Sequence, residues 1–154
     1  MKKVLIISAV FLFVDQLIKG LMTHFLNVGD TVEVIKNFFS ITLIQNTGAA
    51  FSIMSQNTVF LILMTFVVLI AIYFIVIKDH ELNKFESITY GILVGGILGN
   101  FVDRIINGYV IDYMHFTFGS YSFPIFNFAD TCIVTSVILI IIDMYRRRNE
   151  IRSK

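Results

Sequence analysis

The sequence predicts an all-α membrane protein with four transmembrane helices and a few short strands outside the bilayer. Hydrophobic residues make up 56% of the chain and charged residues only 15%, and the mean hydropathy of +0.81 lies far above that of soluble globular proteins. A single proline leaves the long apolar runs uninterrupted. Because each span needs roughly 20 residues, the length suits one membrane domain covering residues 1–154.

Four apolar segments of membrane-spanning length predict the helices, at residues 4–22, 58–77, 87–106 and 128–145. The first follows Met1-Lys2-Lys3 and so imitates a secretory signal peptide. However, Asp15-Gln16-Leu17-Ile18-Lys19 offers no small-residue cleavage site, and the apolar pattern resumes up to Leu26. A retained first span therefore fits better than a cleaved leader.

The third predicted span carries a cluster of small residues, namely Gly91, Gly95, Gly96 and Gly99. Small residues at such spacing allow helices to approach closely in lipid. The lone Cys132 in the fourth span is expected to be a small packing residue.

Two segments between the spans are predicted to lie outside the bilayer. Residues 28–55 alternate Val32 and Val34 and are rich in β-branched and aromatic residues, which predicts short strands. Residues 107–127 are polar and aromatic with turn signals at Gly108, Gly119-Ser120 and Pro124, which predicts an outer loop.

Lysine and arginine residues predict the orientation. In a four-span arrangement most of them fall on one side: Lys2, Lys3, Lys78, Lys84, Arg146, Arg147, Arg148, Arg152 and Lys154. The opposite side has only Lys36, and Arg104 just inside a helix end. Positive charge marks the cytoplasmic side, so both termini are expected to be cytoplasmic.

With this topology, the unusual polar residues converge on one layer near the outer interface. They are Asp15 and Lys19 in the first span, Asn100, Asp103 and Arg104 at the end of the third, Asp112 in the outer loop, and Asn127 and Asp130 at the start of the fourth. Charged residues in hydrocarbon cost several kcal/mol and tend to be paired or functional. Asp15 and Lys19 are spaced i,i+4 and can form a structural ion pair, and a neighbouring cation can hold Asp103.

Asp112 and Asp130 differ from these pairs, because no basic residue lies between Arg104 and Arg146. One interpretation is structural, with Asp130 a helix-capping residue and Asp112 a loop carboxylate. The other is a catalytic pair that shares one proton, so that one carboxyl acts as acid and the other as base on a water molecule.

Other chemistries have weaker support. The histidines His24, His80 and His115 are scattered, and His80-Glu81 lacks the second histidine of a zinc-protease helix, so neither a metal nor a cofactor is expected. Gly119-Ser120 has no visible base beside it, so a serine nucleophile is not expected either. A formal net charge of +1 gives no basis for nucleic-acid binding. Two alternative functions remain open. The membrane carboxylates alone would also fit a small proton-coupled transporter, and the glycine-rich span would also fit a non-catalytic membrane scaffold.

Five blocks of the sequence resemble the bacterial lipoprotein signal peptidases, also called signal peptidase II. In chain order they are Asp15-Gln16-Leu17-Ile18-Lys19, Asn46-Thr47-Gly48-Ala49-Ala50-Phe51, Gly99-Asn100-Phe101-Val102-Asp103-Arg104, Val110-Ile111-Asp112-Tyr113 and Phe126-Asn127-Phe128-Ala129-Asp130. Each block is weak by itself, whereas five in the family's order over nearly the whole chain are specific. Gln45 departs from the pattern, because many members carry a basic residue there.

The resemblance implies an extracytoplasmic β-cradle and an aspartate dyad at Asp112 and Asp130. It further implies residues that support the dyad or bind substrate: Asp15, Lys19, Asn46, Gly48, Ala49, Gly99, Asn100, Asp103, Arg104, Asn127 and Ala129. The implied reaction is cleavage of a prolipoprotein signal peptide just before a diacylglyceryl-modified cysteine, near the extracytoplasmic face of the bacterial cytoplasmic membrane. The implied partners are lipid-modified prolipoproteins, membrane lipid and inhibitory peptide antibiotics such as globomycin, and the expected state is a monomer.

Overall fold

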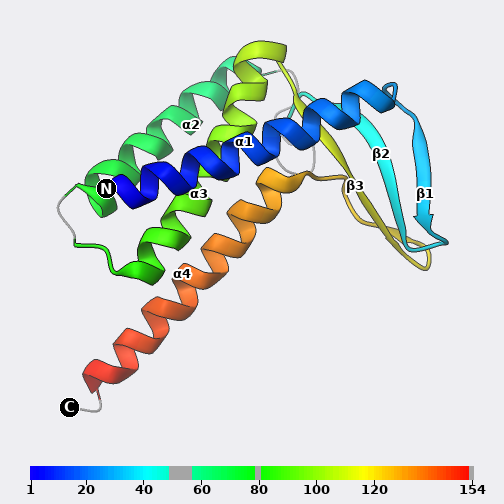
Figure 1. The fold of residues 1–154 in the computed structure, drawn as a ribbon. Helices are drawn as coiled ribbons and strands as arrows, with labels where there is room; N and C mark the ends of the chain where they lie inside the picture. Colours follow the sequence, from blue (N-terminus) through cyan, green and yellow to red (C-terminus); the bar gives the residue numbers. More distant parts are fainter. Residues whose placement is uncertain (49–56, 79–80, 153–154) are drawn as a thin grey trace.

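The structure is a computed structural model that describes residues 1–48, 57–78 and 81–152. Long helices form one part of the molecule and a small antiparallel sheet forms the other (Figure 1). The helices are α1 (Lys2–Phe25), α2 (Thr58–Ile72), the π-helix η2 (Tyr73–Ile77), α3 (Lys84–Asn107) and α4 (Phe128–Arg152). The strands are β1 (Thr31–Ile35), β2 (Phe39–Asn46), β3 (Val110–Phe118) and β4 (Tyr121–Ser122).

Glycines allow α3 to pack closely against both α1 and α4. A Cβ atom added to Gly95 would lie 2.7 Å from the Cβ of Phe11 in α1. One added to Gly96 would lie 2.7 Å from the carbonyl oxygen of Ala129 and 3.0 Å from the Cβ of Cys132, both in α4. The two contacts of 2.7 Å are too short for a real side chain, so the predicted small-residue face is a helix-packing surface, and Cys132 packs against it.

The face of α1 that meets α3 explains why two charged residues point inward. The buried residues of α1 are Val4, Ser8, Asp15 and Lys19, and their spacing follows the helical repeat along one face. Asp15 and Lys19 therefore extend the packed face of α1 rather than turning toward its exposed side.

Three described helices, α1, α3 and α4, are long and apolar enough to cross a membrane. The predicted span at residues 58–77 divides into the shorter α2 and the π-helix η2 that directly follows it. The other helices extend beyond their predicted limits because polar residues at their ends continue the helix outside the apolar run. At α3, for example, Asn83 and Glu86 form a reciprocal capping box that starts the helix at Lys84.

The sheet has the strand order β1-β2-β3-β4 with antiparallel pairing. The predicted strand segment 28–55 supplies β1 and β2, and its residues 49–55 lie outside the described residues. The predicted outer loop 107–127 was wrong in part, because it contains β3 and β4. Asp112 is therefore a strand residue, paired opposite Ile44 of β2. The prediction failed because the backbone of β3 is hydrogen-bonded to β2, which is distant in the sequence.

Gly108 makes the transition from α3 to β3 possible. It ends the helix with a positive φ of 81°, and its N–H donates to the carbonyl of Arg104. Glycine adopts this left-handed conformation without the strain of a side chain. The chain then enters β3 only two residues later, which brings Asp112 back beside the end of α3.

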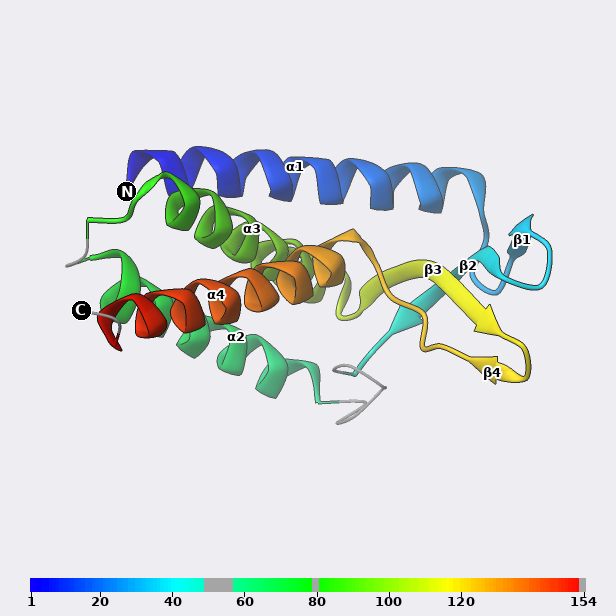
Figure 2. The same cartoon turned by 90° about the horizontal axis from the view of Figure 1, so that it is seen from below.

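The two ends of the helical part differ in character. The start of α1 and the end of α4 lie at one end, and the sheet lies at the other (Figures 1 and 2). The C-terminal ends of α1 and α3 and the first turn of α4 all face the sheet end, where the predicted polar layer gathers (Figure 2).

Candidate active site

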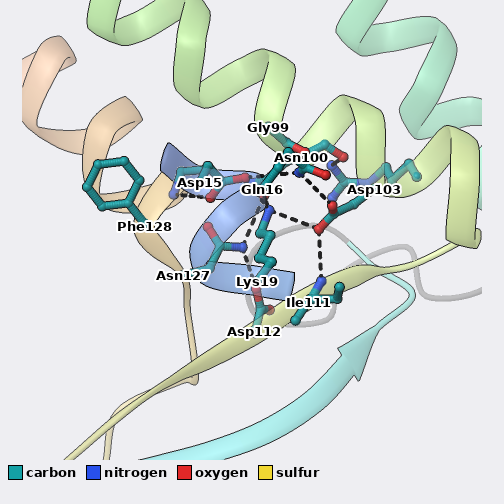
Figure 3. A network of polar contacts seen from close by, with 12 residues as sticks. Asp15, Gln16, Lys19, Gly99, Asn100, Asp103, Ile111, Asp112, Asn127 and Phe128 are labelled. Carbon is teal, nitrogen blue, oxygen red and sulfur yellow. Dashed lines mark hydrogen bonds and ion pairs between the residues drawn. The ribbon is translucent and has the colours of Figure 1, made fainter. Parts of the chain in front are cut away.

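A buried lysine is the centre of the polar cluster between the helices and the sheet. The Nζ atom of Lys19 lies 2.8 Å from Oδ2 of Asp15 and 2.9 Å from Oδ2 of Asp103, and it donates to Oδ1 of Asn100 at 3.0 Å. Lys19, Asp15 and Asp103 are each no more than 1% exposed. The predicted i,i+4 pair is present, and the cation that holds Asp103 is the same lysine (Figure 3).

The two carboxylates on Lys19 also accept hydrogen bonds from the backbone of other elements. Oδ1 of Asp15 accepts the N–H of Ala129 at 3.0 Å, and Oδ2 of Asp103 accepts the N–H of Ile111 at 3.1 Å. The cluster therefore connects α1 and α3 to the start of α4 and to β3 (Figure 3).

Asp112 reaches this cluster from β3 and is 1% exposed. Asn127 donates to its Oδ1 at 2.6 Å, and Asn46 donates to its Oδ2 at 2.8 Å. Burial and the nearby charge of Asp130 raise the pKa of Asp112 to about 7, and the two amide hydrogen bonds only partly oppose that rise. Asp112 can therefore hold or release a proton near neutral pH.

Asp130 lies in the first turn of α4, as predicted, but it shares the capping role with Asn127. The side chain of Asn127 accepts the N–H of Asp130 at 2.9 Å, and the carboxylate of Asp130 accepts the N–H of Asn127 at 3.2 Å. The other carboxylate oxygen of Asp130 accepts from Asn100 Nδ2 at 2.7 Å. Half-buried Asp130 thus has one oxygen in the helix cap and one in the polar cluster.

Asn127 joins the two predicted dyad residues through a single side chain. Its Nδ2 atom donates both to Asp112 and, at 3.0 Å, to Asn100 Oδ1, while its Oδ1 atom caps the N–H of Asp130. Asn127 is fully buried, and all of its polar side-chain atoms are hydrogen-bonded. Asp112 and Asp130 are therefore fixed relative to each other without a direct hydrogen bond between them.

Both aspartates line one cleft of about 460 Å³. Its polar wall also includes Asn46, Asn100 and Arg104. Its apolar wall comes from residues 123–126 and from Ile133 and Val134 of α4. A cleft with an apolar wall and two convergent carboxyl groups suits an apolar substrate that carries one polar reacting group.

Arg104 connects the cleft to the chain just after β2. Its Nη2 atom donates to the carbonyl of Gly48 at 3.0 Å, and the N–H of Gly48 donates to Oδ1 of Asn46 at 2.9 Å. Asn46 is thereby oriented with its amide group toward Asp112. Next to Asp112, burial raises the pKa of Tyr113, so its hydroxyl stays neutral while it accepts the N–H of Phe128.

The structure brings together all the predicted site residues that it describes. Ala49 lies outside the described residues. Gly99 leaves room for the carboxylate of Asp15, which would collide with a Cβ at that position. Among the described residues, no group of three histidine, cysteine or acidic side chains is arranged to hold a metal ion.

Sequence reasoning missed the role of Gln16. Its Nε2 atom lies within hydrogen-bond distance of three acceptors: Oδ1 of Asp103 at 2.9 Å, and Oδ2 of Asp15 and the carbonyl of Gly99, both at 3.2 Å. The signals in the sequence were its place between Asp15 and Lys19 and its membership of the first of the five family-like blocks.

Comparisons with known proteins agree with this architecture. A family model described as signal peptidase (SPase) II matches residues 7–146. A lipoprotein signal peptidase of Staphylococcus haemolyticus is 39% identical over 145 residues, which cover 94% of this chain and 92% of the relative. One of Staphylococcus aureus is 39% identical over 150 residues, which cover 97% of this chain and 92% of the relative.

Two solved structures, each described as a bacterial membrane enzyme determined by the in meso method, have the same fold. The structure at 2.3 Å resolution has a TM-score of 0.88 and 35% identity, and the match covers 97% of this chain and 92% of that one. The structure at 1.9 Å resolution has a TM-score of 0.82 and 37% identity, with 94% and 93% covered. The chain thus belongs to the signal peptidase II family and is a membrane protease.

Proposed function

We propose that this chain is an intramembrane aspartic endopeptidase that removes the signal peptide of diacylglyceryl-modified prolipoproteins. Cleavage takes place just before the lipidated cysteine, and Asp112 and Asp130 activate the attacking water. The observation that carries the proposal is that the two carboxyl groups line one cleft and are joined through the buried Asn127.

The dyad performs this reaction with one proton shared between its carboxyl groups. The ionised carboxylate accepts a proton from water as the water oxygen attacks the scissile carbonyl carbon, and the protonated carboxyl donates its proton to the carbonyl oxygen. A proton then passes to the amide nitrogen, the C–N bond breaks, and the new amine and carboxylic acid leave. The raised pKa of Asp112, about 7, favours a pair that holds one proton near neutral pH.

The walls of the cleft suit a lipidated substrate. An acyl-modified cysteine and an apolar signal helix both partition into the bilayer, so the scissile bond is presented at the interface. The apolar wall formed by residues 123–126 and α4 lies beside the dyad, where such a substrate would pack. Asn46, Arg104 and residues 48–49 are candidates for holding its peptide backbone, and peptide antibiotics such as globomycin are expected to compete for the same cleft.

The charge distribution supports an outward-facing site in a protein with four spans, in which α2 and η2 together form the second span and the chain acts as a monomer. Exposed basic residues gather at the end where α1 starts and α4 ends: Lys2, Lys3, Lys78, Lys84, Arg146, Arg147 and Arg148. The sheet end has Lys36 and the half-buried Arg104. By the positive-inside rule both termini are cytoplasmic and the dyad faces the extracytoplasmic side.

The test is cleavage of a diacylglyceryl-modified prolipoprotein by purified wild type, Asp112→Asn and Asp130→Asn. The two substitutions keep side-chain shape but remove the carboxyl chemistry, so each is expected to abolish cleavage while the protein stays folded. Asp143→Asn is the matched control, because Asp143 lies on α4 but at its far end, where it pairs with Arg147. A precursor without the diacylglyceryl group tests the substrate assignment and should remain uncut. Retained cleavage in both dyad variants would refute the mechanism.

A further inference from the structure

The two supporting carboxylates occupy equivalent places relative to the dyad. Asp15 accepts the N–H of Ala129, the residue directly before Asp130. Asp103 accepts the N–H of Ile111, the residue directly before Asp112. A shift of either supporting carboxylate would therefore move the backbone that carries one dyad residue.

Two side chains from α1 connect these carboxylates to each other. Lys19 contacts Asp15 at 2.8 Å and Asp103 at 2.9 Å. Gln16 reaches the same two residues through Nε2, at 3.2 Å and 2.9 Å. The third donor of Lys19 goes to Asn100 (Figure 3). The side-chain amide of Asn100 in turn donates to Asp130.

The contacts of Lys19 go beyond those that would be needed to stabilise α1 alone. An i,i+4 ion pair between Asp15 and Lys19 alone would stabilise α1, typically by less than 1 kcal/mol at an exposed site. Here the pair is fully buried and extends to Asp103 on α3. Without the cation, two buried carboxylates would face each other with no compensating charge, and they would be driven apart or protonated.

We propose that Lys19 and Gln16 are positioning residues that hold Asp112 and Asp130 at their working separation by clamping Asp103 and Asp15. Neither side chain belongs to the described lining of the cleft, so both act through the carboxylates rather than on the substrate. The inference rests on the proposed function, since it requires that the dyad performs the chemistry.

The positioning role predicts an effect on kcat rather than on KM. Displacing a reacting group by about 1 Å can lower the rate about 100-fold. Lys19→Met keeps the apolar stem but removes the charge and all three donors, so kcat should fall about 100-fold while KM changes less than about threefold. Gln16→Leu leaves the lysine in place and should lower kcat by about threefold to tenfold. Gln16→Glu, which adds a carboxylate against Asp15 and Asp103, should lower kcat further than Gln16→Leu.

Lys3→Met is the matched control, because Lys3 is an exposed lysine of the same helix. It should keep the wild-type kcat. Thermal unfolding and binding of an uncleaved lipopeptide to each variant measure how much protein is folded. Loss of folded protein alone would lower the amplitude of cleavage and binding together, whereas mispositioning lowers turnover in protein that still binds.

The pH profile supplies a second readout that a merely structural role would not move. The charged groups around Asp112 are Asp130, Lys19 and Arg104. The positive charge of Lys19 favours the ionised form of Asp112, so its loss should move the alkaline limb of kcat to higher pH. Lys3→Met should leave that limb unchanged.

The outcomes separate the inference from the proposed function. Cleavage by Asp112→Asn and Asp130→Asn would overturn the proposed function. If those variants are inactive but Lys19→Met keeps the wild-type kcat and pH profile, the positioning role is overturned. If Lys19→Met does not fold, the two Gln16 variants decide, and wild-type kcat in both overturns the inference.

Discussion

Removing the side-chain amide of Asn127 should shift the pH dependence of cleavage upward. This amide donates to Oδ1 of Asp112 at 2.6 Å inside a fully buried site. A hydrogen bond to a carboxylate favours its ionised form, so the bond opposes the burial that raises the pKa of Asp112 to about 7. Without the bond, the pKa of Asp112 should rise further.

The size of the shift follows from the bond that is lost. A hydrogen bond to a charged group contributes about 1.5 to 3 kcal/mol, and one pKa unit corresponds to about 1.4 kcal/mol. The pKa of Asp112 should therefore rise by about one to two units. A dyad that works with one shared proton loses activity when that proton dissociates, so the alkaline limb should move up by about the same amount.

Two substitutions separate this effect from helix capping. Asn127→Ser keeps an oxygen that can accept the N–H of Asp130 but has no amide to donate to Asp112. Asn127→Ala loses both functions and should unfold more easily than Asn127→Ser, by about 0.5 to 2 kcal/mol. Both variants should show the same shift of the alkaline limb.

The assay is the rate of cleavage of a diacylglyceryl-modified lipopeptide, measured as kcat over a pH range centred near pH 7, together with thermal unfolding in the same lipid or detergent. If the alkaline limb of folded Asn127→Ser coincides with that of wild type, Asn127 does not control the proton of the dyad. An equal shift in the control Asp143→Asn would likewise show that the effect does not arise at the site.

Two further predictions concern helix packing and the far end of the molecule. Gly99→Ala should lower both the unfolding temperature and kcat, because its Cβ would collide with the carboxylate of Asp15. Gly20→Ala is the control, because Gly20 has open space around it, and it should raise stability by up to about 1 kcal/mol. A Gly99→Ala variant as stable as Gly20→Ala would contradict the packing argument. Arg147→Gln removes a half-exposed ion pair with Glu86 at 2.7 Å, so it should lower the free energy of unfolding by about 1 kcal/mol or less and leave kcat unchanged. A large loss of kcat would mean that this end of the molecule acts on the dyad.

Hydropathy predicted where the helices run but not where they end. Apolar runs report the part of a helix that faces lipid, whereas local polar contacts decide its ends. The fourth span was predicted to end at residue 145, whereas α4 continues to Arg152. The helix continues because Arg147 forms ion pairs with Asp143 one turn earlier and with Glu86 on α3.

The sheet was only half predictable, for a different reason. The pairing of β3 with β2 joins segments about seventy residues apart, and turn residues on both sides of β3 resembled those of a loop. The family motifs named the residues of the site but not their contacts. That Lys19 would hold Asp103 as well as Asp15 depends on how closely α1 and α3 approach, which is a tertiary property.

The distribution of cations around Asp112 and Asp130 is consistent with the proposed sharing of one proton. Lys19 directs its donors to Asp15, Asp103 and Asn100, and the bonds of Arg104 go to the carbonyls of Gly48 and Asn100. Within the described parts of the chain, neither cation forms an ion pair with the dyad.

The amides of Asn46, Asn100 and Asn127 meet the dyad oxygens instead. Amides orient a carboxyl group without supplying the full charge that would force it to ionise. A direct ion pair would stabilise two carboxylates and remove the acid from the pair. In the proposed mechanism, Lys19 compensates the charges of Asp15 and Asp103, and Asp112 and Asp130 remain free to exchange a proton with water and substrate.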